Sequence, residues 1–140
     1  MDDQTSWREQ RREAAAAQAE ALDRRRAAES EQARALLAEF IEKLRAAGVE
    51  PQPLRAPVVG SGTSYRTGIT GWYLRRNKSL GLDTDGNFYI LGTQPSLKSL
   101  LFGVQVLPSD PPLIIGQGAR DGESIPLKQL LQNRLEEPGA

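Results

Sequence analysis

The sequence predicts an α+β protein with a long N-terminal Ala/Arg/Glu-rich helix, an antiparallel β-meander core, a short helix and a C-terminal helix. Three observations predict this class. The residues before Gly48 include no Pro or Gly and are dominated by strong helix formers. Residues 70–91 alternate between apolar and polar side chains, with turn residues between the runs. Near the C-terminus, leucines recur at helical spacing after a Gly-rich loop.

The composition limits the chemistry that the chain can perform. Its 140 residues carry no net formal charge and include neither Cys nor His. Without Cys there are no disulfides, thiolate metal sites or thiol nucleophiles. Without His the chain has neither the commonest general base nor the commonest metal ligand. We therefore expect a non-enzymatic protein and assign no catalytic, cofactor-binding or metal-binding residue.

The N-terminal residues and the hydropathy pattern give an expectation about location. Met1–Gln4 is acidic and polar, unlike the basic and then apolar start of a signal peptide. No apolar run approaches the roughly 20 residues that span a bilayer. We expect a cytoplasmic protein with no membrane partner.

The chain divides into three parts. Residues 1–47 form a helical arm, which a capping box from Ser6 to Glu9 begins and Gly48 ends. Residues 48–57 contain three prolines and are interpreted as a Pro-rich linker. Residues 58–140 are expected to form one compact α+β domain.

The apolar residues of the arm are concentrated at its end. Leu22 is the only large apolar residue between residues 9 and 35, whereas the last turns carry an amphipathic stripe: Leu36, Leu37, Phe40, Ile41 and Leu44. We expect these turns to pack on the domain. The stripe, or the alanine face before it, is also the candidate partner-binding surface. No a/d heptad of large residues is sustained, so a strong coiled coil is not expected.

Within the domain, the pattern predicts a strand over residues 70–76 and another over residues 88–91. A short helix is expected over residues 95–102, with Pro95 in its first turn. Short strands are expected over residues 104–107 and 113–115. The final helix is expected over residues 125–136, with Ser124 as its cap and Pro126 in its first turn.

Three loops are compared with binding motifs. Asp83–Asn87 resembles the opening of a calcium loop but lacks the closing glutamate, so a hairpin turn is favoured. Gly60–Ser64 resembles a phosphate-binding loop, but no P-loop lysine follows it. In the loop 116–124, a polar site could be formed by Arg120, Asp121 and Glu123. A surface loop that caps the last helix is favoured, because most connecting segments simply run over the protein surface.

Two functions from different classes are consistent with these features. The leading expectation is a protein–protein interaction or assembly module, in which the arm binds a partner protein or a second copy of the chain. The alternative is binding of an anion or a nucleic acid by basic residues that are interleaved with aromatic ones: Arg66, Arg75, Arg76 and Lys78. The neutral charge of the whole chain argues against this alternative.

Overall fold

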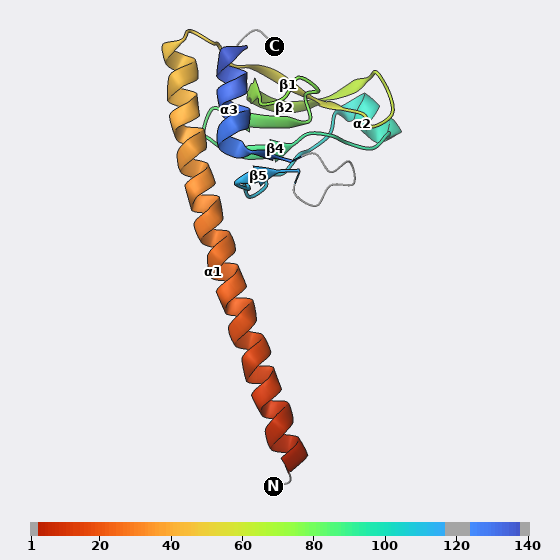
Figure 1. Cartoon of the computed structure of the whole chain (residues 1–140). Coiled ribbons are helices and arrows are strands. Elements are labelled where there is room, and N and C mark those ends of the chain that lie inside the picture. Colours follow the sequence, from red (N-terminus) through yellow and green to blue (C-terminus); the bar gives the residue numbers. More distant parts are fainter. Residues whose placement is uncertain (1–2, 117–123, 138–140) are drawn as a thin grey trace.

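The computed structural model describes residues 3–116 and 124–137, and it confirms the α+β class. The long helix α1 (Asp3–Ala46) comes first and is followed by the meander and two shorter helices (Figure 1). The remaining elements are β1 (Gln52–Pro57), β2 (Ser64–Tyr73), β3 (Leu80–Asp83), β4 (Phe88–Ile90), α2 (Leu97–Phe102), β5 (Ile114–Ile115), β6 (Ile125–Pro126) and α3 (Leu127–Glu136).

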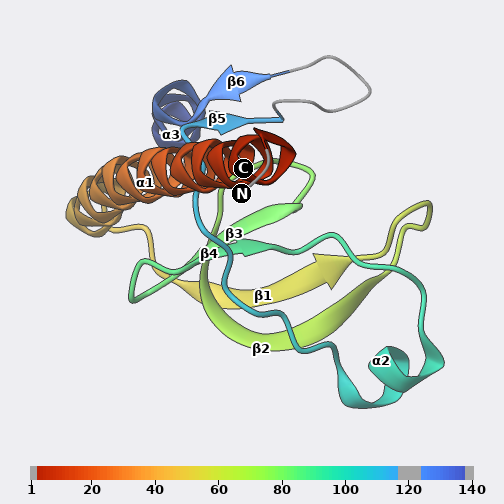
Figure 2. The same ribbon diagram turned by 90° about the horizontal axis from the view of Figure 1, so that it is seen from below.

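The four-stranded sheet is antiparallel, and its strand order follows the chain, β1-β2-β3-β4. The sheet is strongly curved, as the bend of β2 shows (Figure 2). Its two ends meet beyond the last strand: the Val59 amide donates to the Thr93 carbonyl at 2.9 Å, and the Thr93 amide donates to Pro57 at 2.9 Å. An isolated bridge between Val58 and Thr93 therefore links the chain just after the two edge strands and covers that part of each edge.

The main core lies between one face of the sheet and the two long helices. Phe40 and Leu44 of α1 pack there with Trp72 and Leu82 of the sheet and Leu127 of α3. The buried Trp72 donates its indole proton to the Val49 carbonyl at 3.0 Å, just after α1 ends. The expectation that the last turns of α1 pack on the domain is confirmed.

A second, smaller cluster fills the other face of the sheet. Leu54, Tyr73, Tyr89 and Leu91 are buried in it, and Val106 packs against it from the segment after α2. The Tyr73 hydroxyl accepts a hydrogen bond from the Arg55 amide at 2.7 Å. Both faces of the sheet are thus covered, which explains why the alternation in β2 ends in consecutive buried residues.

The expected hairpin turn at Asp83–Asn87 is confirmed, because it joins β3 to β4. The Asp83 carboxylate accepts from the amides of Asp85 and Asn87, both at 2.9 Å. Gly86 has a φ of 92°, a conformation that glycine adopts without strain. The side-chain oxygen that suggested a calcium loop therefore organises the turn itself.

The Pro-rich segment 48–57 differs from the expected linker, because most of it is β1, paired with β2. Pro53 and Pro57 fit there because β1 is an edge strand, where a missing N–H need not break the ladder. The folded domain therefore begins before residue 58, and it also includes the end of α1.

Several element boundaries also differ from the sequence-based ones. β2 begins at Ser64 rather than residue 70, and α2 begins after Ser96, whose hydroxyl accepts from the Ser99 amide at 3.2 Å. Residues 104–107 form no strand. Ser124 does not cap the last helix, because Ile125–Pro126 pair with β5 and α3 begins only at Leu127.

Candidate functional site

The first half of α1 projects from the domain as an isolated helix (Figure 1). From Asp3 to Ala28 the side chains are exposed, apart from a partly covered Ala21. At about 1.5 Å per residue, this part of the helix is roughly 39 Å long. Among the hydrogen bonds described between α1 and the domain, the first along the helix is at Glu29, whose carboxylate accepts from the Leu113 amide at 3.1 Å.

The projecting helix carries few groups that could hold it to another surface by apolar contact alone. Trp7 and Leu22 are its large apolar side chains, and they are 56% and 46% exposed. The Arg11 guanidinium lies 3.9 Å from the centre of the Trp7 ring. Alanines occupy most positions between residues 14 and 21 and would permit close approach of a second helix.

The candidate partner-binding stripe at the end of the arm is buried in the core and is not open to a partner. Four of its residues are at most 8% exposed in the core of the protein, namely Leu37, Phe40, Ile41 and Leu44. Leu36 is partly buried against the same core. The stripe holds α1 on the domain, so in this fold only the earlier part of the arm is open to a partner.

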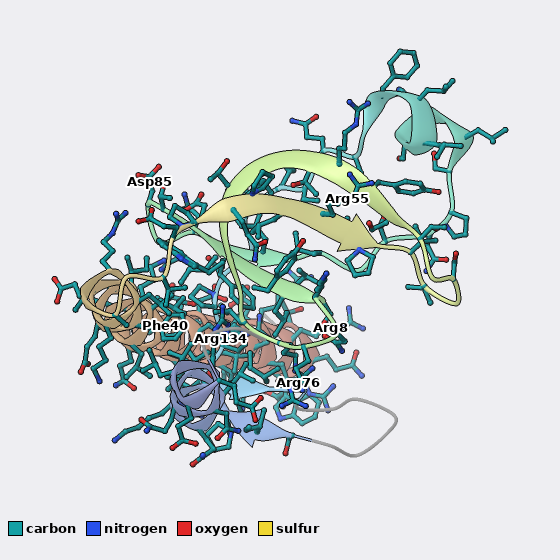
Figure 3. The ribbon with its side chains drawn as sticks, turned by 90° about the horizontal axis from the view of Figure 1, so that it is seen from above. Arg8, Phe40, Arg55, Arg76, Asp85 and Arg134 are labelled. Atoms are coloured by element: carbon teal, nitrogen blue, oxygen red, sulfur yellow. The ribbon has the colours of Figure 1, made fainter. Side chains whose placement is uncertain are left out.

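The four candidate anion-binding residues do not come together. Arg75, Arg76 and Lys78 lie at the turn after β2, where Arg76 pairs with the Glu137 carboxylate. Arg66 lies nine residues earlier, up to about 30 Å along the strand. Figure 3 shows Arg76 on the side of the sheet that faces α3 and Arg55, the β1 partner of Arg66, on the other side.

The aromatic residues that suggested base stacking are also placed differently. Each is at most 8% exposed, and each belongs to the fold: Tyr65, Trp72, Tyr73 and Tyr89. Base stacking requires an open ring face. The basic–aromatic surface expected from the sequence is therefore not assembled in the folded chain.

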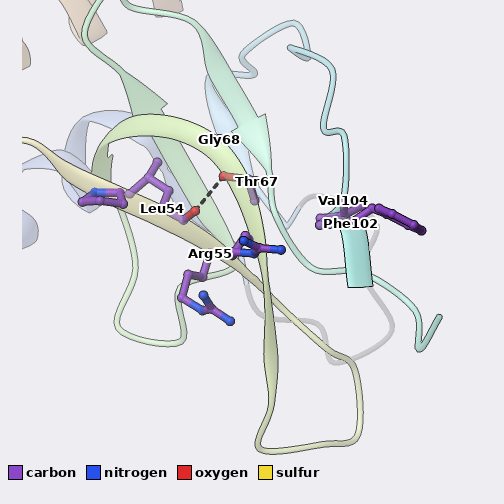
Figure 4. Close-up of a pocket in the computed structure, with 9 residues that line it drawn as sticks. Leu54, Arg55, Thr67, Gly68, Phe102 and Val104 are labelled. Carbon is purple, nitrogen blue, oxygen red and sulfur yellow. Dashed lines mark hydrogen bonds between the residues drawn. The ribbon is translucent and has the colours of Figure 1, made fainter. Parts of the chain in front are cut away.

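Arg66 instead belongs to a hollow between β1, β2 and α2 (Figure 4). The hollow has a volume of about 650 Å³ and is lined by Pro53, Leu54, Arg55, Arg66, Thr67, Gly68, Phe102, Gly103 and Val104. It combines two cations with an apolar wall.

A β-bulge shapes this hollow. Between the pairs Pro53–Thr70 and Arg55–Arg66, β1 advances two residues while β2 advances four. The extra residues include Gly68, whose φ is 74°. The Thr67 hydroxyl donates to the Leu54 carbonyl at 2.6 Å and fixes the bulge. Bulges bend a strand and redirect its side chains, which is how β2 opens a concavity here.

Arg55 and Arg66 are direct cross-strand partners on β1 and β2. Arg55 donates to the side chain and to the carbonyl of Ser64, both at 2.8 Å. Arg66 donates to the Leu101 carbonyl at 3.2 Å. Within residues 3–116 and 124–137, neither guanidinium has an ion-pair partner. The sequence reasoning missed Arg55 because it placed this residue in a linker.

The helix α2 exposes its apolar side chains rather than burying them. Leu97, Leu101 and Phe102 are 81%, 68% and 78% exposed, and no residue of this helix is buried. The chain is held to the sheet just after α2, because the Val104 amide donates to the Arg66 carbonyl at 2.8 Å. A Cβ on Gly103 would lie 2.8 Å from that oxygen.

The other sequence candidates yield no site. The loop after Val58 is a compact turn, closed by a hydrogen bond that the Val58 amide donates to the Thr63 carbonyl at 2.9 Å. Arg120, Asp121 and Glu123 lie outside the described residues. In the part of the chain that the structure describes, no group of acidic residues could hold a metal ion. None of the described helices contains an apolar stretch of the length that a membrane span needs.

Comparisons with protein-family models, curated proteins and solved structures found no match. The candidate surfaces are therefore defined by the geometry of this chain alone. They are the projecting half of α1 and the hollow beside α2.

Proposed function

We propose that this chain is a non-enzymatic protein–protein interaction or assembly module whose projecting helix binds another helix. The observation that carries the proposal is the exposure of residues 3–28, over a length of helix that contributes nothing to the core. A partner is either a second copy of the chain or a different protein.

The geometry of the helix identifies the face that a partner would contact. At about 100° per residue, Leu22 lies five turns before the buried Phe40 and in line with it. Ala15 lies one heptad before Leu22, on the same face. The face that packs on the domain therefore continues outward through a strip formed by Leu22, Gln18 and Ala15, and Arg26 and Arg11 lie at the two ends of this strip. A second helix could extend the packing along this strip.

The energetics of a lone helix favour the same interpretation. In proteins most of the stability of a helix comes from packing one of its faces on another surface, and residues 3–28 have no such packing within the described chain. Within the projecting part, Arg24 lies 4.0 Å from Glu20, and exposed pairs of this kind contribute only about 0.3–0.5 kcal/mol. Pairing with another helix along Leu22 and Ala15 would bury part of the arm's surface and stabilise it.

The experiment is light scattering coupled to size exclusion on the full chain and on a chain beginning at Arg26. This truncation retains the contact from Glu29 to Leu113, so the domain keeps all of its described packing. An oligomer that becomes monomeric on truncation supports self-association. Equal oligomers in both cases would contradict a role for the arm. If both chains are monomers, the next experiment is a pull-down that uses the arm to capture a partner protein.

A matched pair of substitutions makes either test specific. Ala15→Glu places a charge on the strip, whereas Ala17→Glu places the same charge on nearly the opposite side of the helix. Both residues are exposed and have the same helical surroundings. We expect only Ala15→Glu to abolish the association. Equal effects would show that general helix stability or charge, rather than the strip, controls it.

A second candidate function is binding of a nucleic acid or another anion by Arg66 and, at a separate position, by Arg75, Arg76 and Lys78. It is supported by charge segregation, because residues 51–108 contain six basic and two acidic residues although the whole chain is neutral. Such binding would weaken steeply as salt increases. Absence of oligonucleotide binding at low salt would rule it out.

A further inference from the structure

We infer that the hollow between β1, β2 and α2 is a binding site for an amphiphilic carboxylate, that is, a carboxylate joined to an apolar body. The carboxylate would lie between Arg55 and Arg66, and the apolar part would lie against Phe102 and Val104. This inference is independent of the arm, because no residue of α1 lines the hollow.

The charge of the hollow identifies the head group. Like charges directly opposite each other on neighbouring strands destabilise a sheet, yet Arg55 and Arg66 occupy such a pair. Their hydrogen bonds go to Ser64 and to the Leu101 carbonyl, and the other guanidinium donors have no described acceptor. A bound carboxylate would accept from both guanidinium groups and remove their repulsion.

The shape of the hollow is built by the chain. The bulge at Gly68 bends β2, and the hydrogen bond from Val104 to the Arg66 carbonyl fixes the start of the segment after α2. The resulting volume of about 650 Å³ lies within the range of roughly 300–1,000 Å³ that is typical of small-molecule sites. The two cations therefore face a site of suitable size rather than a flat surface.

The apolar wall identifies the rest of the ligand. Phe102 lines the hollow while 78% of it is exposed, and the partly exposed Val104 extends the wall. Burying this surface against an alkyl or aromatic group would contribute about 25 cal/mol for each Å² removed from water. A nucleic acid fits less well, because its bases would need open aromatic faces and Phe102 is the only aromatic residue lining the hollow.

The experiment titrates the full chain with sodium decanoate, below the concentration at which decanoate forms micelles, and follows backbone amide chemical shifts by NMR. We expect saturable shifts at the amides of Arg66, Gly68 and Val104. Acetate carries the charge without the chain, and decanol carries the chain without the charge. Both should bind at least about tenfold more weakly than decanoate. No saturable shift with decanoate at these amides would overturn the inference.

Substitutions with matched controls assign the binding to this hollow. Arg66→Gln should weaken decanoate binding by about tenfold or more, the usual effect of losing a charged hydrogen bond. Lys98→Gln removes a charge from α2 outside the hollow and should leave the affinity unchanged. Equal weakening by both substitutions would contradict the site, because it would indicate a general effect of net charge.

The apolar wall is tested in the same way. Phe102→Ser should weaken decanoate binding and leave the weak acetate binding unchanged. Leu97→Ser alters an equally exposed residue of α2 that does not line the hollow, so it should have no effect. Both side chains are exposed, so neither substitution is expected to unfold the protein. A larger effect of Leu97→Ser would overturn the proposed position of the apolar group.

Two sources could supply this ligand chemistry, and a second titration distinguishes them. Acetyl-Leu-Leu-Phe with a free C-terminal carboxylate represents a protein tail, and its C-terminal amide is the control. Tighter binding of decanoate assigns the site to a free amphiphile. Tighter binding of the tripeptide with the free carboxylate, together with weaker binding of its C-terminal amide, assigns the site to a polypeptide terminus. Displacement of decanoate by a single-stranded oligonucleotide would overturn the amphiphile assignment.

Discussion

Arg134 of α3 donates its Nε proton to the carbonyl oxygen of Tyr73 on β2 at 2.8 Å. Only 7% of this arginine is exposed, and burial lowers the pKa of its guanidinium from the ordinary value. A second hydrogen bond, donated by Nη1, reaches the Glu137 carbonyl at 3.2 Å. The side chain thus joins the end of α3 to the end of β2, where a cation is also favoured by the helix dipole.

Arg134→Met should destabilise the protein by about 2 kcal/mol, because the buried Tyr73 carbonyl loses its donor while the apolar stem of the side chain is retained. Lys128→Met, on the exposed side of α3, should change the unfolding free energy by less than about 0.5 kcal/mol. Urea unfolding measures both. Equal stabilities of the two variants would show that the Arg134 bonds contribute nothing net.

Trp72→Phe should cost about 2–3 kcal/mol, since it opens a cavity in the core and leaves the Val49 carbonyl without its indole donor. Trp7→Phe, on the projecting helix, should have almost no effect on unfolding. The same pair separates the fluorescence of the two tryptophans, and Trp72 should emit at shorter wavelength because it is buried. A large loss of stability in Trp7→Phe would contradict the isolation of the arm.

Local chemistry explains which parts of the fold could be predicted from the sequence. The turn at Asp83–Asn87 was predictable because Asp83 organises it through its own side chain and Gly86 supplies the positive φ. The strand β1 was not, because prolines resemble a linker, and only the position of β1 at the sheet edge makes them acceptable. That position depends on long-range pairing, which the local pattern does not contain.

The hollow beside α2 was only half predictable. Arg66 was identified by its charge and aromatic neighbours, but its actual partner is Arg55, and their pairing depends on the bulge that Gly68 permits. Apolar side chains such as Leu97 are ordinarily expected to be buried, yet α2 exposes them. The hydrophobic pattern of a segment predicts whether it forms a helix or a strand. The position of the hollow depends instead on the register between β1 and β2 and on how α2 packs.

Tyr89 should make the protein sensitive to alkaline pH. Burial, followed by its hydrogen bond to Asp83 and by the charges of Asp83 and Asp85, raises the pKa of Tyr89 to about 12. The ordinary value is 10.0. The stability linked to this group is therefore complete below pH 10 and is lost as pH rises from 10 towards 12. Urea midpoints measured across this range should fall more steeply for the wild type than for Tyr89→Phe.

The same variant provides the control at neutral pH. Tyr89→Phe removes one hydrogen bond to the Asp83 carboxylate, at 2.9 Å, and should cost about 1 kcal/mol at pH 7. That difference should shrink above pH 10. If the two proteins lost stability in parallel up to pH 12, the raised pKa would not contribute to folding.

Asp83 should have the opposite pH dependence. Burial acts to raise its pKa, but hydrogen bonds from Asn87, Tyr89 and the Asp85 amide together outweigh it and lower the pKa below 3.8. Its contribution is complete above pH 3.8 and is lost as pH falls through the lower, folded-state value. Asp83→Asn should flatten this acid loss in urea unfolding, whereas Asp85→Asn should not. An unchanged acid profile in Asp83→Asn would contradict the turn's dependence on the ionised carboxylate.

At Gly71 the backbones of β2 and β3 lie so close together that no side chain fits between them. We therefore expect replacement of Gly71 to be the most damaging of these changes. A Cβ at this position would lie 1.9 Å from the Leu82 carbonyl oxygen, which belongs to the backbone of β3 and has no freedom to move aside. Gly71→Ala should therefore separate β2 from β3 and cost more than about 4 kcal/mol, or prevent folding. Gly92→Ala meets nothing within 4 Å and should be neutral or slightly stabilising. Circular dichroism and urea unfolding of the two variants test this, and a stable Gly71→Ala protein with native spectra would show that the β2–β3 pairing differs from the one described.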